Sequence, residues 1–411
     1  MFKKLTINNW RQFREIEIDF HDRLTILTGA NGAGKTTLLQ LLNRHWGWNL
    51  QFVSTPRFTS KGIRKYWGGF WSEDEDKESE STPLPKQKIG EIEYRSSNKS
   101  ELFVPANVQE TFAIEIRNQP TICGVFVPSH RPPYIFQRVD QIPAQLDAKA
   151  QIFQTYLNEL MARFNAGGRT QSPAFRIKTS LISLATFGYG NEAVDRNEDA
   201  IKTFEGFENI LRIVLPPTLK FRRIRVRVPD VLLDTETGTF SFDAVSGGVA
   251  ALIDMSWQIF MYSLLHDDFV VIIDEPEAHL HPALQQRLLP DLLKAFPKTQ
   301  FIVASHNPFV VSSVPDSNVY VLDYNDELKV DSTFLDLINK SGSANEILRE
   351  VLGLPFTFPI WVDNKIQEII DAFIGKDITE ESLSELRHEM STIGLEHLFP
   401  ETLTKVLQKK Q

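Results

Sequence analysis

The residues that most clearly carry chemistry form a glycine-rich run near the N-terminus. Residues 29–36 read Gly-Ala-Asn-Gly-Ala-Gly-Lys-Thr and fit the pattern G-x-x-x-x-G-K-[ST] in full. Its glycines let backbone N–H groups converge on phosphate oxygens, and the helix that follows directs its positive end at the same anion. We predict ATP and Mg²⁺ as cofactors, with Lys35 on the β- and γ-phosphates and Thr36 on the metal. The predicted nucleotide-binding residues are Asn31, Gly32, Ala33, Gly34, Lys35, Thr36 and Thr37.

A second chemical element is an apolar strand that ends in two carboxylates. Residues 270–275 read Val-Val-Ile-Ile-Asp-Glu. Asp274, at the strand end beside the glycine-rich loop, is expected to hold Mg²⁺ through water. Glu275 would then face the γ-phosphate and polarise the attacking water.

Two weaker signals gain weight from their order and spacing around Asp274. Val245-Ser246-Gly247-Gly248 opens a helix that is apolar nearly all round as far as residue 265, and a serine with two glycines at a helix start forms an anion site. No group of this chain is assigned to that anion site as its occupant. Ser305-His306 follows the apolar run 300–304, where a histidine can meet a γ-phosphate.

Alternating strands and helices must position these residues. Strand-like runs at 2–7, 15–20 and 24–28 precede the glycine loop and a helix from 35 to about 46. Apolar runs at 268–274 and 300–304 flank a helix around 284–295, which favours a doubly wound α/β domain. We predict four regions: 1–50 and 217–355 as two lobes of one domain, 51–216 as an insertion, and 356–411 as a helical tail.

The insertion has a different texture. Residues 71–88 are charged and contain two prolines, so we predict an exposed mobile loop. Strand-like runs follow at 91–94, 102–104, 111–116 and 122–127, then amphipathic helices at 146–164 and 201–214. The first of these helices repeats apolar residues like a coiled coil, which fits packing on the protein's own body or a subunit contact.

Composition limits the class of protein. The 411 residues carry a net charge of −9, and the single cysteine excludes an intrachain disulfide and a thiolate zinc site. No apolar run reaches 18 residues and the start lacks a signal peptide, so we expect a cytoplasmic protein with no membrane partner. The acidic average leaves one basic segment, residues 220–227.

Together these motifs resemble an ABC-type ATPase head of the RecF, SMC and OLD (overcoming lysogenization defect) kind. The string Asp-Glu-Pro-Glu-Ala-His-Leu-His-Pro at 274–282 is especially similar to OLD-like ATPases, and residues 343–353 resemble a segment that follows the head there. The resemblance covers roughly residues 1–50 and 219–355. It implies an α/β fold with a doubly wound mixed sheet, an inserted α+β and helical region, and a helical C-terminal tail.

The resemblance also implies roles. Ser246, Gly247 and Gly248 would complete the nucleotide site of a second subunit, giving a homodimer or higher oligomer with ATP between its heads. Glu275 would be the catalytic base and His306 the switch histidine. The run Val-Ser-Gly-Gly-Val at residues 245–249 corresponds to the signature of this group, and it ends in valine where transporters have glutamine, which argues against a transporter subunit. The glutamine-loop residue stays open among Gln109, Gln119 and Gln137, and His279 and His281 are expected as contacts rather than metal ligands.

The function of the head is a matter of three hypotheses. Many OLD-like proteins carry a Toprim nuclease, but the 90 or so residues after Pro315 read mainly as helices, and Asp323 and Asp326 have the wrong spacing for its metal site. The leading hypothesis is therefore a sensor that regulates a separate effector of nuclease or Toprim type in anti-phage defence, docked on the acidic tail. The alternatives are an ATP-gated scaffold with little turnover and a repair ATPase that clamps DNA through Lys220, Arg222, Arg223, Arg225 and Arg227.

Overall fold

The computed structural model describes most of the chain in two compact units. They span Met1–Ile347 and Leu348–Gln411, and each is described by itself. The described residues are 1–48, 50–58, 64–70, 86–106, 108–131, 134–142, 146–166, 172–336, 344–351, 360–373, 379–392 and 394–410. Residues 71–85 of the predicted mobile loop lie outside them.

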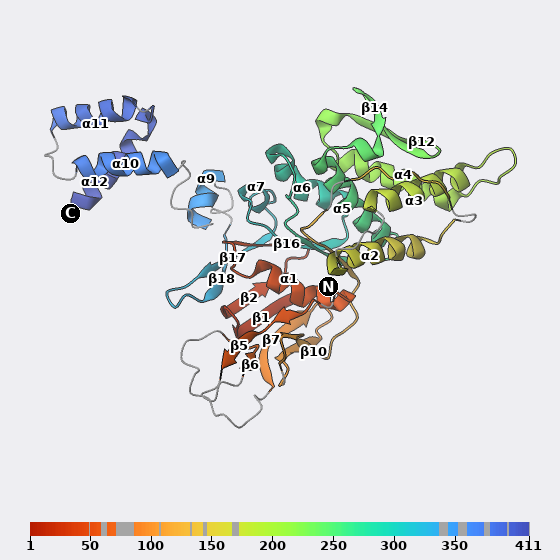
Figure 1. The fold of residues 1–411 in the computed structure, drawn as a ribbon, viewed down its shortest axis with the longest axis horizontal. Helices are drawn as coiled ribbons and strands as arrows, with labels where there is room; N and C mark the ends of the chain where they lie inside the picture. Colours follow the sequence, from red (N-terminus) through yellow and green to blue (C-terminus); the bar gives the residue numbers. More distant parts are fainter. Residues whose placement is uncertain are drawn as a thin grey trace. The chain divides into compact units, whose positions relative to one another are not determined.

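A mixed sheet forms the centre of the first unit (Figure 1), with the strand order β10-β8-β7-β1-β2-β18-β17-β3-β16-β15-β11 in the described part. Its parallel half runs from β17 to β11. These strands are β17 (Asn318–Tyr324), β3 (Leu24–Gly29), β16 (Thr299–Ala304), β15 (Phe269–Asp274) and β11 (Gly124–Val127). Every residue of β3, β15 and β16 is buried, as expected for strands covered on both faces. The apolar runs at 24–28, 268–274 and 300–304 are thus confirmed as buried strands.

The other half of the sheet is mainly antiparallel. It contains β1 (Phe2–Trp10), β2 (Phe13–Asp19), β7 (Gln87–Tyr94), β8 (Lys99–Val104), β10 (Glu115–Arg117) and β18 (Val330–Phe334). The predicted α/β class with a mixed sheet is confirmed. Strands from the region 51–216 lie within this same sheet, so residue 50 is not a boundary of the sheet.

The strand expected at 111–116 is divided between two sheets. β9 (Thr111–Phe112) pairs with β4 (Phe52–Val53), whereas β10 pairs with β8 in the main sheet. A single continuous strand was therefore wrong, because the chain changes partner between Phe112 and Glu115. A further small hairpin joins β5 (Thr55–Phe58) to β6 (Arg64–Trp67).

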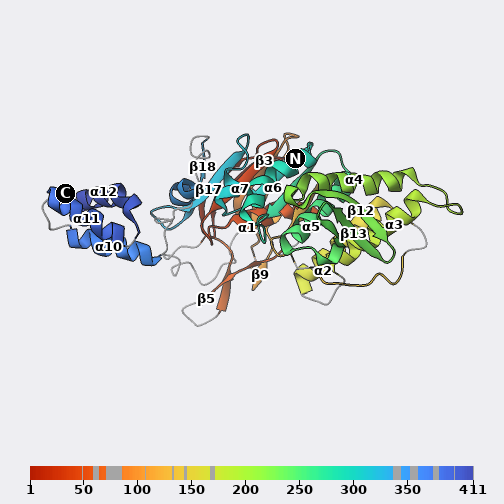
Figure 2. The ribbon, with the colours of Figure 1, turned by 90° about the horizontal axis from the view of Figure 1, so that it is seen from above.

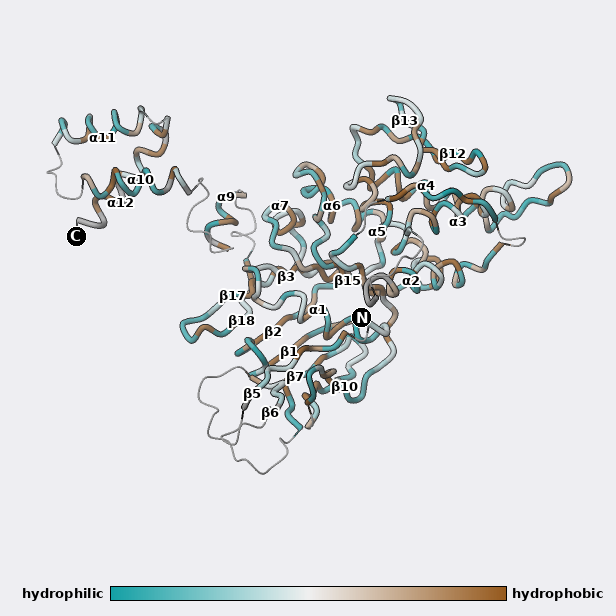
Figure 3. Tube along the Cα trace, viewed as in Figure 1, coloured by the Kyte–Doolittle hydropathy of each residue, from teal (hydrophilic) through white to brown (hydrophobic). Residues whose placement is uncertain are grey.

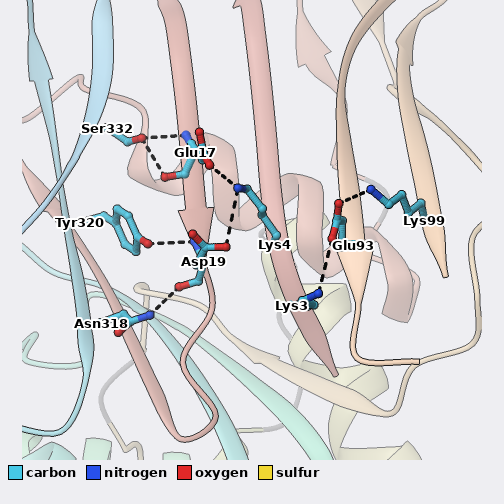
Figure 4. A network of polar contacts seen from close by, with 9 residues as sticks. All are labelled: Lys3, Lys4, Glu17, Asp19, Glu93, Lys99, Asn318, Tyr320 and Ser332. Atoms are coloured by element: carbon cyan, nitrogen blue, oxygen red, sulfur yellow. Dashed lines mark hydrogen bonds and ion pairs between the residues drawn. The ribbon is translucent and has the colours of Figure 1, made fainter. Parts of the chain in front are cut away.

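Polar side chains connect the two halves of the sheet (Figure 4). Lys4 on β1 pairs with both Glu17 and Asp19 on β2, at 3.8 Å for Asp19. The Asp19 backbone N–H donates to the Tyr320 hydroxyl at 2.9 Å, and the Asn318 amide donates to the Asp19 carbonyl at 2.8 Å. Strand β2 is thereby joined to β17, which lies next to the glycine-rich loop.

Helices and a small sheet gather at one end of the first unit (Figure 2). They are α2 (Lys149–Ala166), α3 (Pro173–Tyr189), α4 (Glu198–Val214) and α5 (Gly247–Ser263), with the sheet β12 (Phe221–Arg227), β13 (Asp230–Thr235) and β14 (Gly238–Ser241). Helix α2 buries Phe153, Tyr156 and Leu160 and packs on α5 and α3, so the expectation that it packs on the protein's own body is confirmed. Along α2, Ala150 is exposed and Ile152 is buried.

Shorter helical elements complete the first unit. They are α1 (Lys35–Asn43), α6 (Pro282–Ala295), α7 (Pro308–Val311) and α9 (Ala344–Glu346), with 3-10 turns at Arg44–Trp46, Pro217–Leu219 and Phe242–Ala244. The hydropathy colouring of Figure 3 shows hydrophobic residues concentrated along the strands that these helices cover.

The second unit begins with the end of a π-helical turn, Ile347–Val351, and its described residues form three α-helices with their own apolar core. They are α10 (Ile360–Phe373), α11 (Glu380–Thr392) and α12 (Phe399–Lys410). The core comprises Val362, Ile366, Ile369, Ile370, Phe373, Leu386, Met390, Leu395, Leu398 and Val406. The helical tail is confirmed. No helix among the described residues is long and apolar enough to cross a membrane.

Two side chains cap the start of α11, whose first residue is Glu380. The Thr379 hydroxyl accepts from the Ser382 N–H at 3.2 Å, and the Ser382 hydroxyl accepts from the Thr379 N–H at 2.9 Å.

Candidate nucleotide site

The glycine-rich loop connects β3 to α1 where close packing requires glycine. Gly29 has φ +133, and a Cβ there would lie 2.2 Å from the Leu322 carbonyl oxygen of β17. Gly34 has φ +95, and its Cβ would lie 2.4 Å from the Phe13 ring. The loop is therefore held between β17 and the β1–β2 turn, with Asn31 and Gly32 exposed and the first N–H groups of α1 directed at it.

Lys35 lies at the start of α1 and folds back over the loop. Its Nζ donates to the carbonyl oxygens of Gly29 at 2.8 Å and Ala30 at 3.0 Å. Burial lowers the pKa of this ammonium, and the nearby carboxylates of Glu275 and Asp274 oppose that shift. The positive charge therefore lies inside the loop, among the groups that the sequence assigns to phosphate.

Thr36 and Asp274 meet across the sheet. The Thr36 hydroxyl donates to the Asp274 carboxylate at 3.0 Å, because β15 and β16 end in register at Asp274 and Ala304 and β3 ends beside β16. Burial raises the pKa of Asp274 to about 6, and the Thr36 hydrogen bond opposes the rise. A hydroxyl and a carboxylate are hard oxygen ligands that fit Mg²⁺ when a nucleotide supplies the rest. No cluster of three acidic, histidine or cysteine residues suited to a metal occurs in the part of the chain that the structure describes.

Glu275 follows β15 in a strained backbone conformation. Its φ is +46, and its N–H donates to the Ala304 carbonyl at 2.9 Å. His306 follows β16, and its Nδ1 lies 3.6 Å from a Glu275 carboxylate oxygen. Both side chains are about half exposed, at 43% and 50%. The loop, the carboxylates and the histidine thus share one edge, because parallel strands present their carboxyl ends together.

The structure adds Glu277, for which we predicted no role beyond its place in the 274–282 string. Its side chain is 6% exposed, and one carboxylate oxygen accepts from the Ser305 hydroxyl at 2.6 Å. Burial raises its pKa. The contact ties the turn after β15 to the turn that carries His306.

Ser246, Gly247 and Gly248 make none of the contacts described above around Lys35, Thr36 and Asp274. They open α5, and the Ser246 hydroxyl makes no cap hydrogen bond to that helix. Ser246 and Gly247 are exposed, while a Cβ on Gly248 would lie 3.0 Å from the His279 carbonyl oxygen. His281 caps α6 through its ring Nδ1, 3.3 Å from the Ala283 N–H.

The basic row on β12 is largely neutralised. Arg223 and Arg225 pair with the buried Asp234 at 3.1 and 2.5 Å. Lys220 pairs with Glu236 at 2.7 Å, and Arg222 lies 3.9 Å from the same carboxylate. Both acids follow Arg227 within ten residues, on β13 and in the turn after it.

None of the glutamine candidates takes part in the described contacts among Lys35, Thr36, Asp274, Glu275 and His306. The Gln137 side chain accepts instead from the Ser172 N–H at 2.8 Å. An arginine from the segment after β11 does reach this region, since the Arg131 guanidinium donates to the Asp274 carbonyl oxygen at 3.3 Å.

Two family matches cover much of the first unit. Residues 4–118 match a family described as "AAA domain", and residues 178–312 match one described as "AAA domain, putative AbiEii toxin, Type IV TA system". The first match spans the glycine-rich loop and the second spans the signature, Asp274 and His306. Both segments are thus similar to AAA-type ATPase domains.

Parts of the chain are similar to bacterial proteins. A stretch of 137 residues is 28% identical to the "Retron Ec83 probable ATPase" of Escherichia coli, covering 33% of the chain and 24% of that protein. Another of 165 residues is 22% identical to "Septu protein PtuA" of Bacillus thuringiensis, covering 36% and 42%. The ATPase thus aligns with less than half of each relative. Among solved structures, the "SMC head domain from Thermotoga maritima" matches with a TM-score of 0.43 and 14% identity over 82% of the chain and 99% of that domain.

Proposed function

We propose that the chain binds ATP with Mg²⁺ and hydrolyses it. The observation that carries the proposal is the convergence of Lys35, Thr36, Asp274, Glu275 and His306 at one edge of the sheet. In this role residues 31–37 bind the triphosphate, and Thr36 and Asp274 hold the metal. Glu275 orients and deprotonates water, and His306 contacts the γ-phosphate.

The proposal includes a dimer with ATP between its heads. It is supported by the position of Ser246 and Gly247, which are exposed at the start of α5 and make none of the contacts described around Lys35. An exposed helix start with an uncommitted hydroxyl suits an anion carried by another subunit. Each nucleotide would then contact residues 31–37 of one subunit and residues 246–248 of its partner.

At the cellular level we propose a cytoplasmic regulator of a separate effector, of nuclease or Toprim type, in anti-phage defence. The support is the similarity to retron and Septu proteins and the separate acidic tail unit, which suits a docking role. The DNA-clamp alternative is disfavoured because the basic row already pairs with Asp234 and Glu236.

The test of the enzyme is steady-state phosphate release with ATP and Mg²⁺. Wild type should turn over, Lys35→Ala should lose nucleotide binding, and Glu275→Gln should bind ATP while turnover falls by roughly a hundredfold or more. Glu192→Gln is the matched control, because Glu192 is an exposed loop residue. Equal rates for wild type and Glu275→Gln would favour the scaffold hypothesis instead.

The dimer is tested by light scattering on Glu275→Gln with ATP and Mg²⁺. The variant should double its mass with nucleotide, and adding Ser246→Arg should keep it monomeric without weakening ATP binding. A protein that stays monomeric with saturating nucleotide rejects the dimer. Defence is tested by plaque counts on cells that carry the gene with its neighbours, where Lys35→Ala should abolish any protection.

A further inference from the structure

One buried arginine holds the turn that carries Glu275. Arg131, which follows β11, is 6% exposed. Its guanidinium lies 3.3 Å from the carbonyl oxygens of Asp274 and Glu275 and 3.5 Å from that of Pro276. Three consecutive carbonyl groups therefore accept from one planar side chain, which suits the fixed fork of arginine donors.

The turn needs such a contact because Glu275 adopts a left-handed conformation. For a residue with a Cβ this conformation is unfavourable, and it persists only when neighbouring groups enforce it. Ala304 of β16 fixes the N–H of Glu275, and Arg131 fixes its carbonyl group. The direction of the Glu275 side chain thus depends on both contacts.

Arg131 also faces the first turns of the signature helix α5. A cavity of about 160 Å³ is lined by Arg131, Tyr134, Gly247, Ala250, Ala251, Asp254 and His279. In the described part of the chain, the Arg131 Nε and the Tyr134 hydroxyl are buried there without hydrogen-bond partners. Burial lowers the pKa of the Arg131 guanidinium, and the Asp254 carboxylate is the acid that most strongly opposes this shift.

Two packing contacts join the same elements. Tyr134 stacks on Phe242, with ring centroids 5.6 Å apart, and Phe242 precedes Ser246 by four residues. A Cβ on Gly248 would make a tight contact of 3.0 Å with the carbonyl oxygen of His279, which lies in the loop that follows Glu275. The signature turn and the Glu275 turn therefore share one small, partly polar contact region.

We propose that Arg131 is a positioning residue that sets the Glu275 side chain for hydrolysis and links it to residues 246–248 of the same subunit. This inference rests on the proposed function. In the proposed dimer, residues 246–248 contact the nucleotide of the partner while Glu275 acts on the subunit's own. Arg131 therefore conveys occupancy of one nucleotide site to the base of the other.

The test compares Arg131→Ala with Arg23→Ala. Arg23 is a matched control because its guanidinium also donates to backbone carbonyls, at 2.8 Å for Leu293 and 3.0 Å for Thr299, but at the opposite end of the parallel strands. Arg131→Ala should lower kcat by roughly 10- to 100-fold and leave KM for ATP within about threefold. Amide hydrogen exchange in residues 274–281 should rise in Arg131→Ala and not in Arg23→Ala.

Guanidinium ion at millimolar concentration should restore part of kcat in Arg131→Ala and none in Arg23→Ala. Arg131→Lys serves if the alanine variant does not fold, and it should show the same fall in kcat with KM unchanged. Values of kcat within twofold of wild type for folded Arg131 variants, or equal losses in the Arg23 control, overturn the proposal. A wild type without turnover instead rejects the ATPase function on which it rests.

Discussion

The buried ion pair between Lys178 and Asp243 gives the sharpest test of how the signature turn is held. Lys178 lies on α3 and Asp243 in the 3-10 turn before Ser246, and their side chains are 2.6 Å apart with 1% and 5% exposure. Lys178 also donates to the Gln137 carbonyl at 2.7 Å. Lys178→Met leaves a buried carboxylate without its cation, which should cost about 3–5 kcal/mol of unfolding free energy.

Two controls separate burial from charge. The exposed pair Lys298–Asp267, at 3.3 Å with 66% and 89% exposure, predicts that Lys298→Met costs less than about 1 kcal/mol. The double variant Lys178→Met/Asp243→Leu removes both charges, so it should recover much of the loss in Lys178→Met.

Urea unfolding of the four proteins, followed by tryptophan fluorescence, measures these free energies. Because Asp243 precedes Ser246 by three residues, Lys178→Met should also weaken ATP-dependent dimerisation in the Glu275→Gln background. A loss in Lys178→Met no larger than that in Lys298→Met would refute the reasoning, since it would show that this pair contributes no more than a solvated one.

Three further predictions follow from the site and the tail. Burial raises the pKa of Asp274 from 3.8 to about 6, so its ionised form destabilises the folded protein. The contribution of Asp274 to the unfolding free energy therefore falls as pH rises between those values. Asp274→Asn should therefore raise the unfolding free energy by up to about 3 kcal/mol at pH 7 and by almost nothing at pH 3.5 in urea titrations; a gain independent of pH contradicts this. Gly29→Ala should lower the melting temperature far more than Gly47→Ala, because both have positive φ but only Gly29 has a backbone oxygen in the way, and equal shifts would count against the close approach to β17. Removing residues 348–411 should leave the first unit folded with its ATP affinity unchanged, as checked by circular dichroism and nucleotide binding; loss of cooperative unfolding would show that the two units are not independent.

Much of the parallel sheet was predictable because its signals are local. The runs before Gly29, Asp274 and Ser305 are short and continuously apolar, and each leads directly into residues of the predicted nucleotide site. The order of these runs therefore indicates that they meet at one edge of the sheet. Helix α3 was missed although Ser172 and Pro173 form a standard start, with the Ser172 hydroxyl accepting from the Phe175 N–H. Its polar residues are mixed among apolar ones, so no clean period marks it.

The contacts of charged residues were less predictable because they depend on distant partners. Arg223 and Arg225 read as a cationic row until the pairing of β12 with β13 brings Asp234 beside them. Arg131 has no signal of its own, since it acts on backbone carbonyls that any sequence would supply. Such residues become visible only when strands adjacent in space, but distant in sequence, are placed together.

The core of α10, α11 and α12 is built from residues of the second unit, between Val362 and Val406. Selection can therefore alter the outer surface of this small bundle without disturbing the chemistry of the sheet edge. Substitutions on that surface leave the core residues of the bundle unchanged, since the core is formed within the second unit. In the proposed regulator, a change of partner would then require substitutions only on this bundle.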